Sequence, residues 1–351
     1  MIKLITLNDL HNYGNRLQNY ATQRFFRNHN YIIENIVDES YYTLVVKGIK
    51  KRIKSNLIYI YRRGINHWLM QKKMEKNFLS FNKMIIYSGI ETKTISDLKE
   101  YESNIFVVGS DQVWNPQFGM SEITLLKDLH CEKKVSFSSS FGVDDIPYNE
   151  TIAQCINDFD AISVRETAGA RIIKELTGRD STVLVDPTML LTNEEWRAVS
   201  KKPKRVKDGY ILTYFLSPMC EHAKENLDKI SAGRKVYELL NPEDKVVGAA
   251  GPSEFLWLFD HADIILTDSF HACVFSFLFN KPFIVYDRNW GAGNMNSRIE
   301  TLLSKFHLER KYANSGLDND IWEHDYTEGY KQLEIEREKA IKFLKEALGV
   351  D

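Results

Sequence analysis

The chain has 351 residues and a mass of 40.8 kDa, more than one hydrophobic core of ordinary size, so its length favours two domains over a small binding module. Hydrophobic residues make up 43% and charged residues 27%, which excludes a disordered or collagen-like chain. The 46 basic and 48 acidic residues leave a net charge of -2, so nothing in the overall charge favours a dedicated nucleic-acid binder, and we expect no nucleic-acid partner.

The first half of the chain alternates short apolar runs with segments of helical spacing. Residues 2–7 predict a strand, and the apolar residues 17, 20, 21 and 25 after it predict a helix. Further strands are predicted at residues 31–37, 105–108, 134–137, 161–164 and 183–185. This alternation is typical of a parallel sheet covered by helices.

Residues 47–76 differ in composition, because lysines and arginines interleave there with apolar residues such as Leu57, Trp68 and Leu69. The pattern predicts a basic amphipathic helical insertion. Two interpretations remain open: a solvated helix that covers the sheet, or a surface for anionic lipid or a lipid-linked sugar phosphate. The second would make the protein a peripheral partner of the inner face of the membrane.

After Asp186-Pro187 the alternation restarts, with strands predicted at residues 210–215, 235–239, 263–267 and 283–286. The last helix has an apolar stripe from Leu333 to Leu348 and a glycine cap at Gly349. We therefore predict an α/β fold of two Rossmann-like domains, residues 1–187 and 188–351, whose parallel sheets face a cleft. We expect the last helix to pack back against the N-terminal domain.

Ligands of open parallel sheets bind beyond the carboxyl ends of the strands, which makes the polar residues there the first candidates. Asn12 to Asn15 precede the first helix, where a helix start binds an anion or a sugar hydroxyl, although an ordinary loop with an Asn cap explains them equally well. The strand at 105–108 runs into Ser110 and Asp111. Asp111 suits deprotonation or orientation of a hydroxyl, and its alternative role is a structural helix cap.

Trp114 and Asn115 follow in the same loop, and they suit a sugar: the indole offers an apolar face and the amide offers hydrogen bonds. Arg165 ends the strand at 161–164, where its guanidinium suits a carboxylate or phosphate. The alternative for Arg165 is an ion-pair network with Glu166 or Arg171.

The strand at 263–267 delivers Asp268, Ser269 and His271 to a helix start. His271 suits donation to a phosphate or general acid catalysis, with Asp268 fixing its tautomer. Arg288 follows the strand at 283–286, and Arg298 follows the glycine-containing loop at 291–293. Either arginine adds positive charge to a site at this edge of the sheet.

The four cysteines form no C-x-x-C pair, so we expect neither a zinc knuckle nor a disulfide framework, and a reducing, cytoplasmic location. The chain has neither the long apolar region of a signal peptide nor about eighteen consecutive apolar residues, so we expect no export and no membrane span. The P-loop, zincin, nucleophile-elbow and dinucleotide motifs are missing. Anion binding must therefore come from helix starts and arginines.

Taken in order, several segments resemble the polysaccharide pyruvyl transferase family. They are residues 12–18, 109–115, 163–166, 186–187 and 267–271, with further matches at 251–256, 281–283 and 297–299. The resemblance implies a fold similar to glycosyltransferases of the B type. It also implies phosphoenolpyruvate as donor, a hexose of a growing, often lipid-linked cell-surface saccharide as acceptor, a pyruvate ketal as product, and no metal or other cofactor.

Matched position by position to the family's motifs, Arg165 and His271 are the residues expected to bind the donor. Asp111 and Asn115 are expected to bind the acceptor or to act as the catalytic base. The full set of candidates is His271, Asp111 and Asp268 for catalysis, Arg165, Ser269, His271, Arg288 and Arg298 for the donor, and Asn12, Asn15, Ser110, Trp114 and Asn115 for the acceptor.

One position departs from the family pattern. Well-studied members have an arginine two residues before the matching histidine, and here that residue is Ser269. Arg288 or Arg298 is then expected to supply the guanidinium. Two alternatives stay open: a glycosyltransferase that uses a nucleotide sugar in the same cleft, and a non-catalytic saccharide-binding protein docked to the membrane by residues 47–76.

Overall fold

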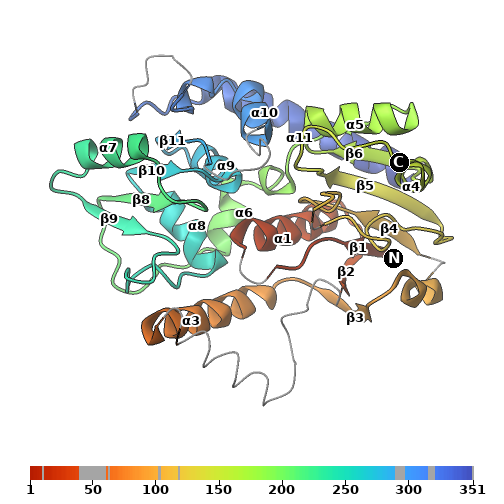
Figure 1. Ribbon diagram of the computed structural model, residues 1–351, viewed down its shortest axis with the longest axis horizontal. Coiled ribbons are helices and arrows are strands. Elements are labelled where there is room, and N and C mark those ends of the chain that lie inside the picture. Colours follow the sequence, from red (N-terminus) through yellow and green to blue (C-terminus); the bar gives the residue numbers. More distant parts are fainter. Residues whose placement is uncertain are drawn as a thin grey trace.

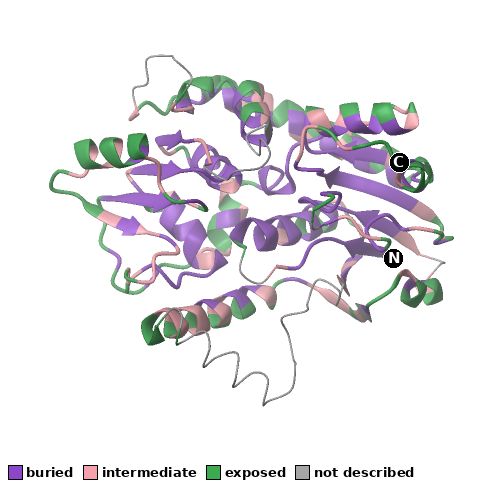
Figure 2. Ribbon diagram, in the orientation of Figure 1, coloured by how far each residue is buried: buried purple, intermediate pink, exposed green. Residues whose placement is uncertain are grey.

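The computed structural model of the protein describes residues 1–9, 12–38, 61, 64–101, 104–117, 119–288, 297–314 and 321–349. These residues form two parallel β-sheets covered by helices (Figure 1), so the predicted α/β fold with two parallel sheets is confirmed. The central strands of both sheets are almost entirely buried, and most exposed residues lie on the helices, the loops and the edge strands (Figure 2).

In the described part of the chain, the first sheet has seven strands in the order β3-β2-β1-β4-β5-β6-β7, and neighbouring strands run parallel. Its strands are β1 (Ile2–Ile5), β2 (Ile33–Asp38), β3 (Tyr87–Thr92), β4 (Ile105–Val108), β5 (Lys133–Ser139), β6 (Ala161–Val164) and β7 (Thr182–Val183). β4 and β6 have the predicted bounds. β3 was not predicted, and β7 ends two residues before the predicted strand does.

The second sheet has four described strands in the order β11-β10-β8-β9, again all parallel. Its strands are β8 (Tyr210–Tyr214), β9 (Lys235–Glu238), β10 (Ile264–Thr267) and β11 (Phe283–Val285). All four lie within the predicted segments. The change from one sheet to the other falls between β7 and β8, and the exact domain border at 187 and 188 stays a prediction.

The helices cover both sheets. They are α1 (Tyr13–Asn28), α3 (Ile65–Asn82), α4 (Glu150–Asn157), α5 (Thr167–Thr177), α6 (Asn193–Ala198), α7 (Glu221–Ile230), α8 (Pro252–His261), α9 (Phe270–Leu278), α10 (Ser297–Lys305) and α11 (Thr327–Leu348), with short 3-10 helices η1 (Ile95–Tyr101), η2 (Pro187–Met189) and η3 (Glu309–Lys311). α11 ends at Gly349 in the left-handed conformation (φ 71°), which supports the predicted glycine cap.

Of the predicted basic insertion, residues 65–76 lie in α3, and residues 47–60 and 62–63 lie outside the described residues. None of the described helices combines the length and the apolar composition that a membrane crossing needs.

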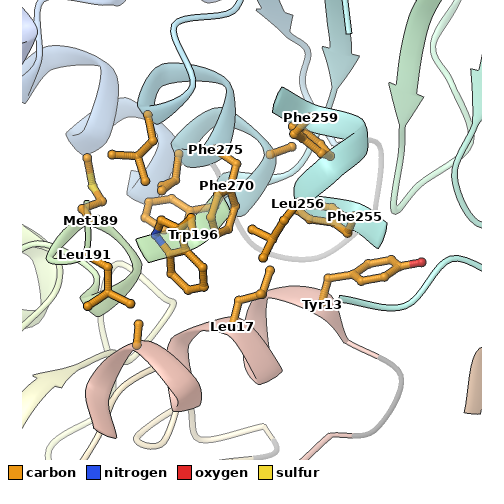
Figure 3. Close-up of a cluster of buried hydrophobic side chains, with 14 of the residues drawn as sticks. Tyr13, Leu17, Met189, Leu191, Trp196, Phe255, Leu256, Phe259, Phe270 and Phe275 are labelled. Atoms are coloured by element: carbon orange, nitrogen blue, oxygen red, sulfur yellow. The ribbon is translucent and has the colours of Figure 1, made fainter. Parts of the chain in front are cut away.

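A single apolar core joins the two halves. Side chains from α1, α8, α9 and the segment around α6 meet in it, as Figure 3 shows for Leu17, Leu256, Phe275 and Trp196. Tyr13 of α1 stacks on Phe255 of α8, with 4.7 Å between the ring centroids. Such a continuous apolar contact holds the strand ends of both sheets near one another.

The last helix, α11, contacts both halves. Its Arg337 donates hydrogen bonds to the carbonyls of Met189 (3.0 Å) and Leu191 (2.7 Å), next to the first sheet. Near its end, the carbonyl of Ala347 accepts from Nζ of Lys133 at the start of β5, at 3.2 Å. The chain therefore returns from the second sheet to the first.

Candidate functional site

Arg165, Asp186 and His271 come together from three separate segments of the chain. Arg165 follows β6, Asp186 lies between β7 and η2, and His271 lies in the first turn of α9. Nη1 of Arg165 donates to Oδ2 of Asp186 at 2.5 Å, and the same oxygen lies 3.6 Å from Nε2 of His271. Arg165 and Asp186 are buried, so the first sheet places an ion pair directly beside the histidine.

The start of α1 lies against the imidazole of His271. A Cβ atom on residue 14 would lie only 2.0 Å from Nδ1 of His271, so the backbone at Gly14 leaves no space for a side chain. Asn12 caps α1 by accepting from the backbone N–H of Asn15 at 3.1 Å. Gly14 was predicted in the loop before the first helix, but it lies in the first turn of α1, where its missing side chain permits a close approach to His271.

The ion pair determines the charge state of both partners. Burial alone would lower the pKa of Arg165, but the carboxylates of Asp186, Asp111 and Glu166 outweigh it and raise that pKa. Burial alone would raise the pKa of Asp186, but the Arg165 guanidinium, His271 and the hydroxyl of Thr188 bring it well below its ordinary value. Both groups are therefore charged at neutral pH.

Arg298 adds a second buried guanidinium, from α10. Its guanidinium carbon lies 5.9 Å from the ring centroid of Phe270, and that of Arg165 lies 5.0 Å from the same centroid. When the amide of Gln112 is oriented to suit both groups, its oxygen accepts from Nη2 and Nη1 of Arg298 at 2.6 and 2.9 Å.

In the described part of the chain, no carboxylate lies within 4.0 Å of the Arg298 guanidinium. Burial and the like charge of Arg165 lower the pKa of Arg298 to about 10. A buried cation in this situation is stabilised by an anion.

Asp111 joins the cluster from the loop after β4, with Oδ1 3.7 Å from Nη2 of Arg165. Its Oδ2 accepts from the side-chain amide of Asn15 at 2.9 Å. Its φ of 68° is in the left-handed region, which is uncommon for a residue other than glycine. Asn12, another predicted acceptor residue, is exposed, and its side chain caps α1 as described above.

Several buried polar atoms of this cluster have no hydrogen-bond partner among the described residues. They are Nε and Nη2 of Arg165, Nε2 of His271, Nε of Arg298, Oγ of Ser110 and Oε2 of Glu166. Buried polar groups are normally paired, and a group of unpaired donors around one point is typical of a ligand site. Four of these atoms are donors of arginine or histidine side chains, which bind anions.

Three sequence predictions need correction. Trp114 is fully buried, donates its indole N–H to the carbonyl of Thr124 at 3.0 Å and packs on Phe141 and Phe159, so it has no free face for a sugar. Asn115 is also buried, and its side-chain oxygen accepts from the N–H of Gln117 at 2.9 Å, which makes it a turn residue.

The third correction concerns Asp268. Its carboxylate accepts from the backbone N–H groups of Leu216 (2.7 Å) and Ser217 (2.9 Å) and from the Ser217 hydroxyl (2.7 Å). It therefore fixes the loop after β8, and the carboxylate beside His271 is that of Asp186.

The other donor candidates lie around the same loop. Nη2 of Arg288 donates to the carbonyl of Asp268 at 3.1 Å, and its Nε lies 3.8 Å from Oδ2 of that residue. The backbone N–H of Ser269 donates to the Thr267 hydroxyl at 3.0 Å, and Ser269 begins α9 without a side-chain cap bond. Their roles toward a donor stay predictions.

Asp186 and Gln112 belong to the cluster although neither was predicted as a site residue. Glu166 was predicted as an ion-pair partner of Arg165, and its Oε2 lies 4.0 Å from Nε of Arg165. Oε1 of Glu166 accepts from the Ser140 hydroxyl at 2.9 Å and from two backbone N–H groups, so it holds the loop beside Arg165. Asp186 and Gln112 do occur in the segments that carried the family resemblance, which was the available signal. No group of three or more His, Cys, Asp or Glu suited to a metal ion occurs within the described ranges.

Comparison with protein families gives one match: the family model described as polysaccharide pyruvyl transferase matches residues 12–289. This range includes Arg165, Asp186 and His271, and it ends before Arg298. The comparison with curated proteins finds no match.

Solved structures align with nearly the whole chain at low sequence identity. The UDP-GlcNAc 2-epimerase from Neisseria meningitidis bound to UDP-GlcNAc is 9% identical with a TM-score of 0.47, covering 97% of this chain and 94% of that chain. The Methanocaldococcus jannaschii UDP-GlcNAc 2-epimerase in complex with UDP-GlcNAc and UDP is 12% identical with a TM-score of 0.47, covering 95% and 98%. An alpha-glucosyltransferase in complex with UDP and a 13-mer DNA is 9% identical with a TM-score of 0.46, covering 99% and 95%.

Proposed function

The chain belongs to the polysaccharide pyruvyl transferase family, and from that premise we propose that it transfers the pyruvyl group of phosphoenolpyruvate to a hexose of a cell-surface polysaccharide or of its lipid-linked precursor. The product is a ketal on two hydroxyls of the sugar. The proposed compartment is the cytoplasm, and the reaction uses neither a metal nor another cofactor.

One observation carries the choice of an anionic donor: Arg298 is a buried cation that bonds an amide, and no carboxylate of the described residues lies within 4.0 Å of its guanidinium. Next to it, Nε and Nη2 of Arg165 make no hydrogen bond among the described residues, and their carboxylate neighbours lie at ion-pair distance, 4.0 Å for Glu166 and 3.7 Å for Asp111. A ligand with two anionic groups, a carboxylate and a phosphate, satisfies both guanidiniums at once. In this proposal Arg298 supplies the guanidinium that well-studied family members have at the position of Ser269.

The reaction needs a proton donor and a base beside this anion site. The donor's methylene carbon takes up one proton, its neighbouring carbon becomes cationic, and the first sugar hydroxyl attacks that carbon and loses its proton. The bond to phosphate oxygen then breaks, and the second hydroxyl attacks and loses its proton. Of the two protons released, one balances the proton added to the methylene carbon and the other leaves with phosphate.

His271 is the proposed acid, because its Nε2 makes no hydrogen bond among the described residues and lies 3.6 Å from the Asp186 carboxylate, while the backbone at Gly14 lies against Nδ1. Asp111 is the proposed base for a sugar hydroxyl, because Asn15 orients its carboxylate at 2.9 Å and Arg165 keeps a cation beside it. Asp111 follows a strand of the first sheet and His271 follows a strand of the second. Asp111 lies 3.7 Å from Arg165, and His271 lies 3.6 Å from Asp186, the ion-pair partner of Arg165.

The test is isothermal titration calorimetry of the full chain with phosphoenolpyruvate, with a UDP-sugar as the competing ligand class. We expect phosphoenolpyruvate to bind and the UDP-sugar not to bind. Arg298→Gln should weaken phosphoenolpyruvate binding by about 30-fold or more, the cost of losing a charge-assisted contact. Arg171→Gln, which changes an exposed arginine of α5, is the matched control and should leave the affinity unchanged.

Binding of a UDP-sugar alone would replace this proposal with a nucleotide-sugar glycosyltransferase. Binding of phosphoenolpyruvate that Arg298→Gln leaves intact would keep the donor but remove Arg298 from its site. His271→Gln should retain binding within a few-fold and abolish phosphate release in the presence of a saccharide acceptor, because the histidine acts in the chemical step.

A further inference from the structure

The inner side of α3 is fixed against the protein. Met74, Phe78 and Phe81 are its buried residues, and the ring of Phe78 lies 5.0 Å from that of Tyr13. The side-chain amide of Asn77 donates to the carbonyl of Ala249 at 2.8 Å, in the second half of the chain. The opposite side of α3 therefore has a defined orientation away from the core.

That opposite side exposes large apolar side chains. Ile65 is 50% exposed, Leu69 and Leu79 are 53% exposed, and Met84, just beyond the helix, is 36% exposed. A helix places residues four and seven apart on one face, so these residues share a side of α3. Figure 2 shows exposed positions along α3 at the edge of the molecule.

The same side is basic. Lys73 and Lys76 are exposed between the apolar residues, and exposed Lys83 follows the helix. The helix contains one acid, Glu75, and it is paired with Lys72 at 2.6 Å. The outer face of α3 consists of Ile65, Leu69, Lys73, Lys76, Leu79, Lys83 and Met84, and it carries a net positive charge in a protein whose overall charge is -2.

We propose that the outer face of α3 docks the protein on a bilayer that contains anionic lipids. Apolar side chains of this size enter the boundary between headgroups and acyl chains, and the lysines beside them contact the anionic headgroups. Charge complementarity alone would suit any acidic surface. The exposed isoleucine, leucines and methionine within the basic face favour a lipid surface, because burial of apolar area there adds to the attraction.

The proposal does not depend on the proposed function, since it concerns a surface outside the donor site. Docking of α3 would place the bilayer beside this helix. On the buried side of α3, Phe78 packs on Tyr13 of α1. Tyr13 directly precedes Gly14, the residue that contacts His271. A lipid-linked substrate would therefore meet the protein on the side where α1 begins.

The test is flotation of the full chain with vesicles of phosphatidylcholine alone and of phosphatidylcholine with phosphatidylglycerol. We expect binding to the vesicles with phosphatidylglycerol and not to the others, and weaker binding as salt shortens the screening length. The variant Lys73→Gln/Lys76→Gln/Lys83→Gln should bind those vesicles about a hundredfold more weakly. The variant Leu69→Ser/Leu79→Ser should lose about tenfold or more.

The control variant makes the same three charge changes on α11, at Lys331, Lys342 and Lys345, which are exposed beside acidic residues. It should bind as the unchanged protein does. Failure of the unchanged protein to bind phosphatidylglycerol vesicles would overturn the proposal, and so would equal losses in the α11 control or full binding by both α3 variants. Light scattering that shows a dimer broken by the α3 changes would instead assign this face to a second copy of the chain. Thermal melting of every variant checks that the fold is retained.

Discussion

Arg165 of the first half and Arg298 of the second half lie over the same ring, that of Phe270, yet their pKa values are shifted in opposite directions. The first half surrounds Arg165 with the carboxylates of Asp186, Asp111 and Glu166, and the pKa of Arg165 is raised. Arg298, from the second half, has no described carboxylate within 4.0 Å, and burial and the charge of Arg165 lower its pKa to about 10.

The difference distinguishes an arginine that stabilises the folded protein from one that is available to bind an anion, a distinction that residue type alone does not give. Arg165 is part of the folded structure, because buried carboxylates depend on it for their charge balance. Arg298 is a cation whose balance is incomplete in the protein alone, as expected of a group that binds an anionic ligand. Three measurements test this comparison, in decreasing order of expected effect.

The largest effect is expected from Arg165→Gln. It leaves Asp186 as a buried carboxylate without its 2.5 Å guanidinium partner, so the free energy of unfolding should fall by about 3–5 kcal/mol. Urea denaturation measures the change. If Arg165→Gln and Arg298→Gln destabilised the protein equally, the distinction between the two arginines would be lost.

The next effect concerns acid. The folded state lowers the pKa of Asp186, so its ion pair stabilises the protein above about pH 4, the ordinary value for an unfolded aspartate, and this stability is lost as pH falls below that value. We expect the urea midpoint to fall steeply between about pH 4 and about pH 2.5. Arg298→Gln should show the same dependence, because no described carboxylate pairs with Arg298. A flat profile for the unchanged protein would contradict the assignment.

The smallest effect has the opposite sign. Removal of the buried charge in Arg298→Gln should raise the free energy of unfolding by about 1 kcal/mol without ligand, because the relief of burial exceeds the loss of packing on Phe270. Thermal melting with and without phosphoenolpyruvate measures it, and the ligand should stabilise only the unchanged protein. A lower melting temperature for Arg298→Gln would show that Gln112 alone compensates the charge.

Much of the fold could be predicted from the sequence, because a buried parallel strand is a continuous apolar run between polar residues. β4 and β6 show this pattern, and their bounds were predicted. β3 was missed because its residues are mostly half-buried and its sequence contains Ser88 and Gly89, which gives no apolar run. Strands at the edge of a sheet need fewer apolar residues, so composition identifies them less well.

The site could be predicted only where a residue's position at a strand end already implied its surroundings, as for Arg165 and His271. Trp114 and Asp268 look equally suitable in sequence, but their polar atoms are satisfied by backbone groups of distant segments. Asp186 was read as the border between two domains, because nothing near it in sequence indicates its contact with His271. Hydrogen bonds and ion pairs between residues distant in sequence determine which polar groups remain unpaired and can bind a ligand. Local sequence patterns do not contain this information.

The path of α11 has a mechanical consequence. The helix is fixed near its start, where Tyr330 donates to the carbonyl of Phe277 at 2.8 Å, and near its end, where Ala347 accepts from Lys133. One continuous helix is thus bonded to both halves. A displacement of one half relative to the other would have to break one of these hydrogen bonds or bend α11 between them, in addition to the 2.7 Å hydrogen bond from Tyr13 to Ala250 on the other path between the halves.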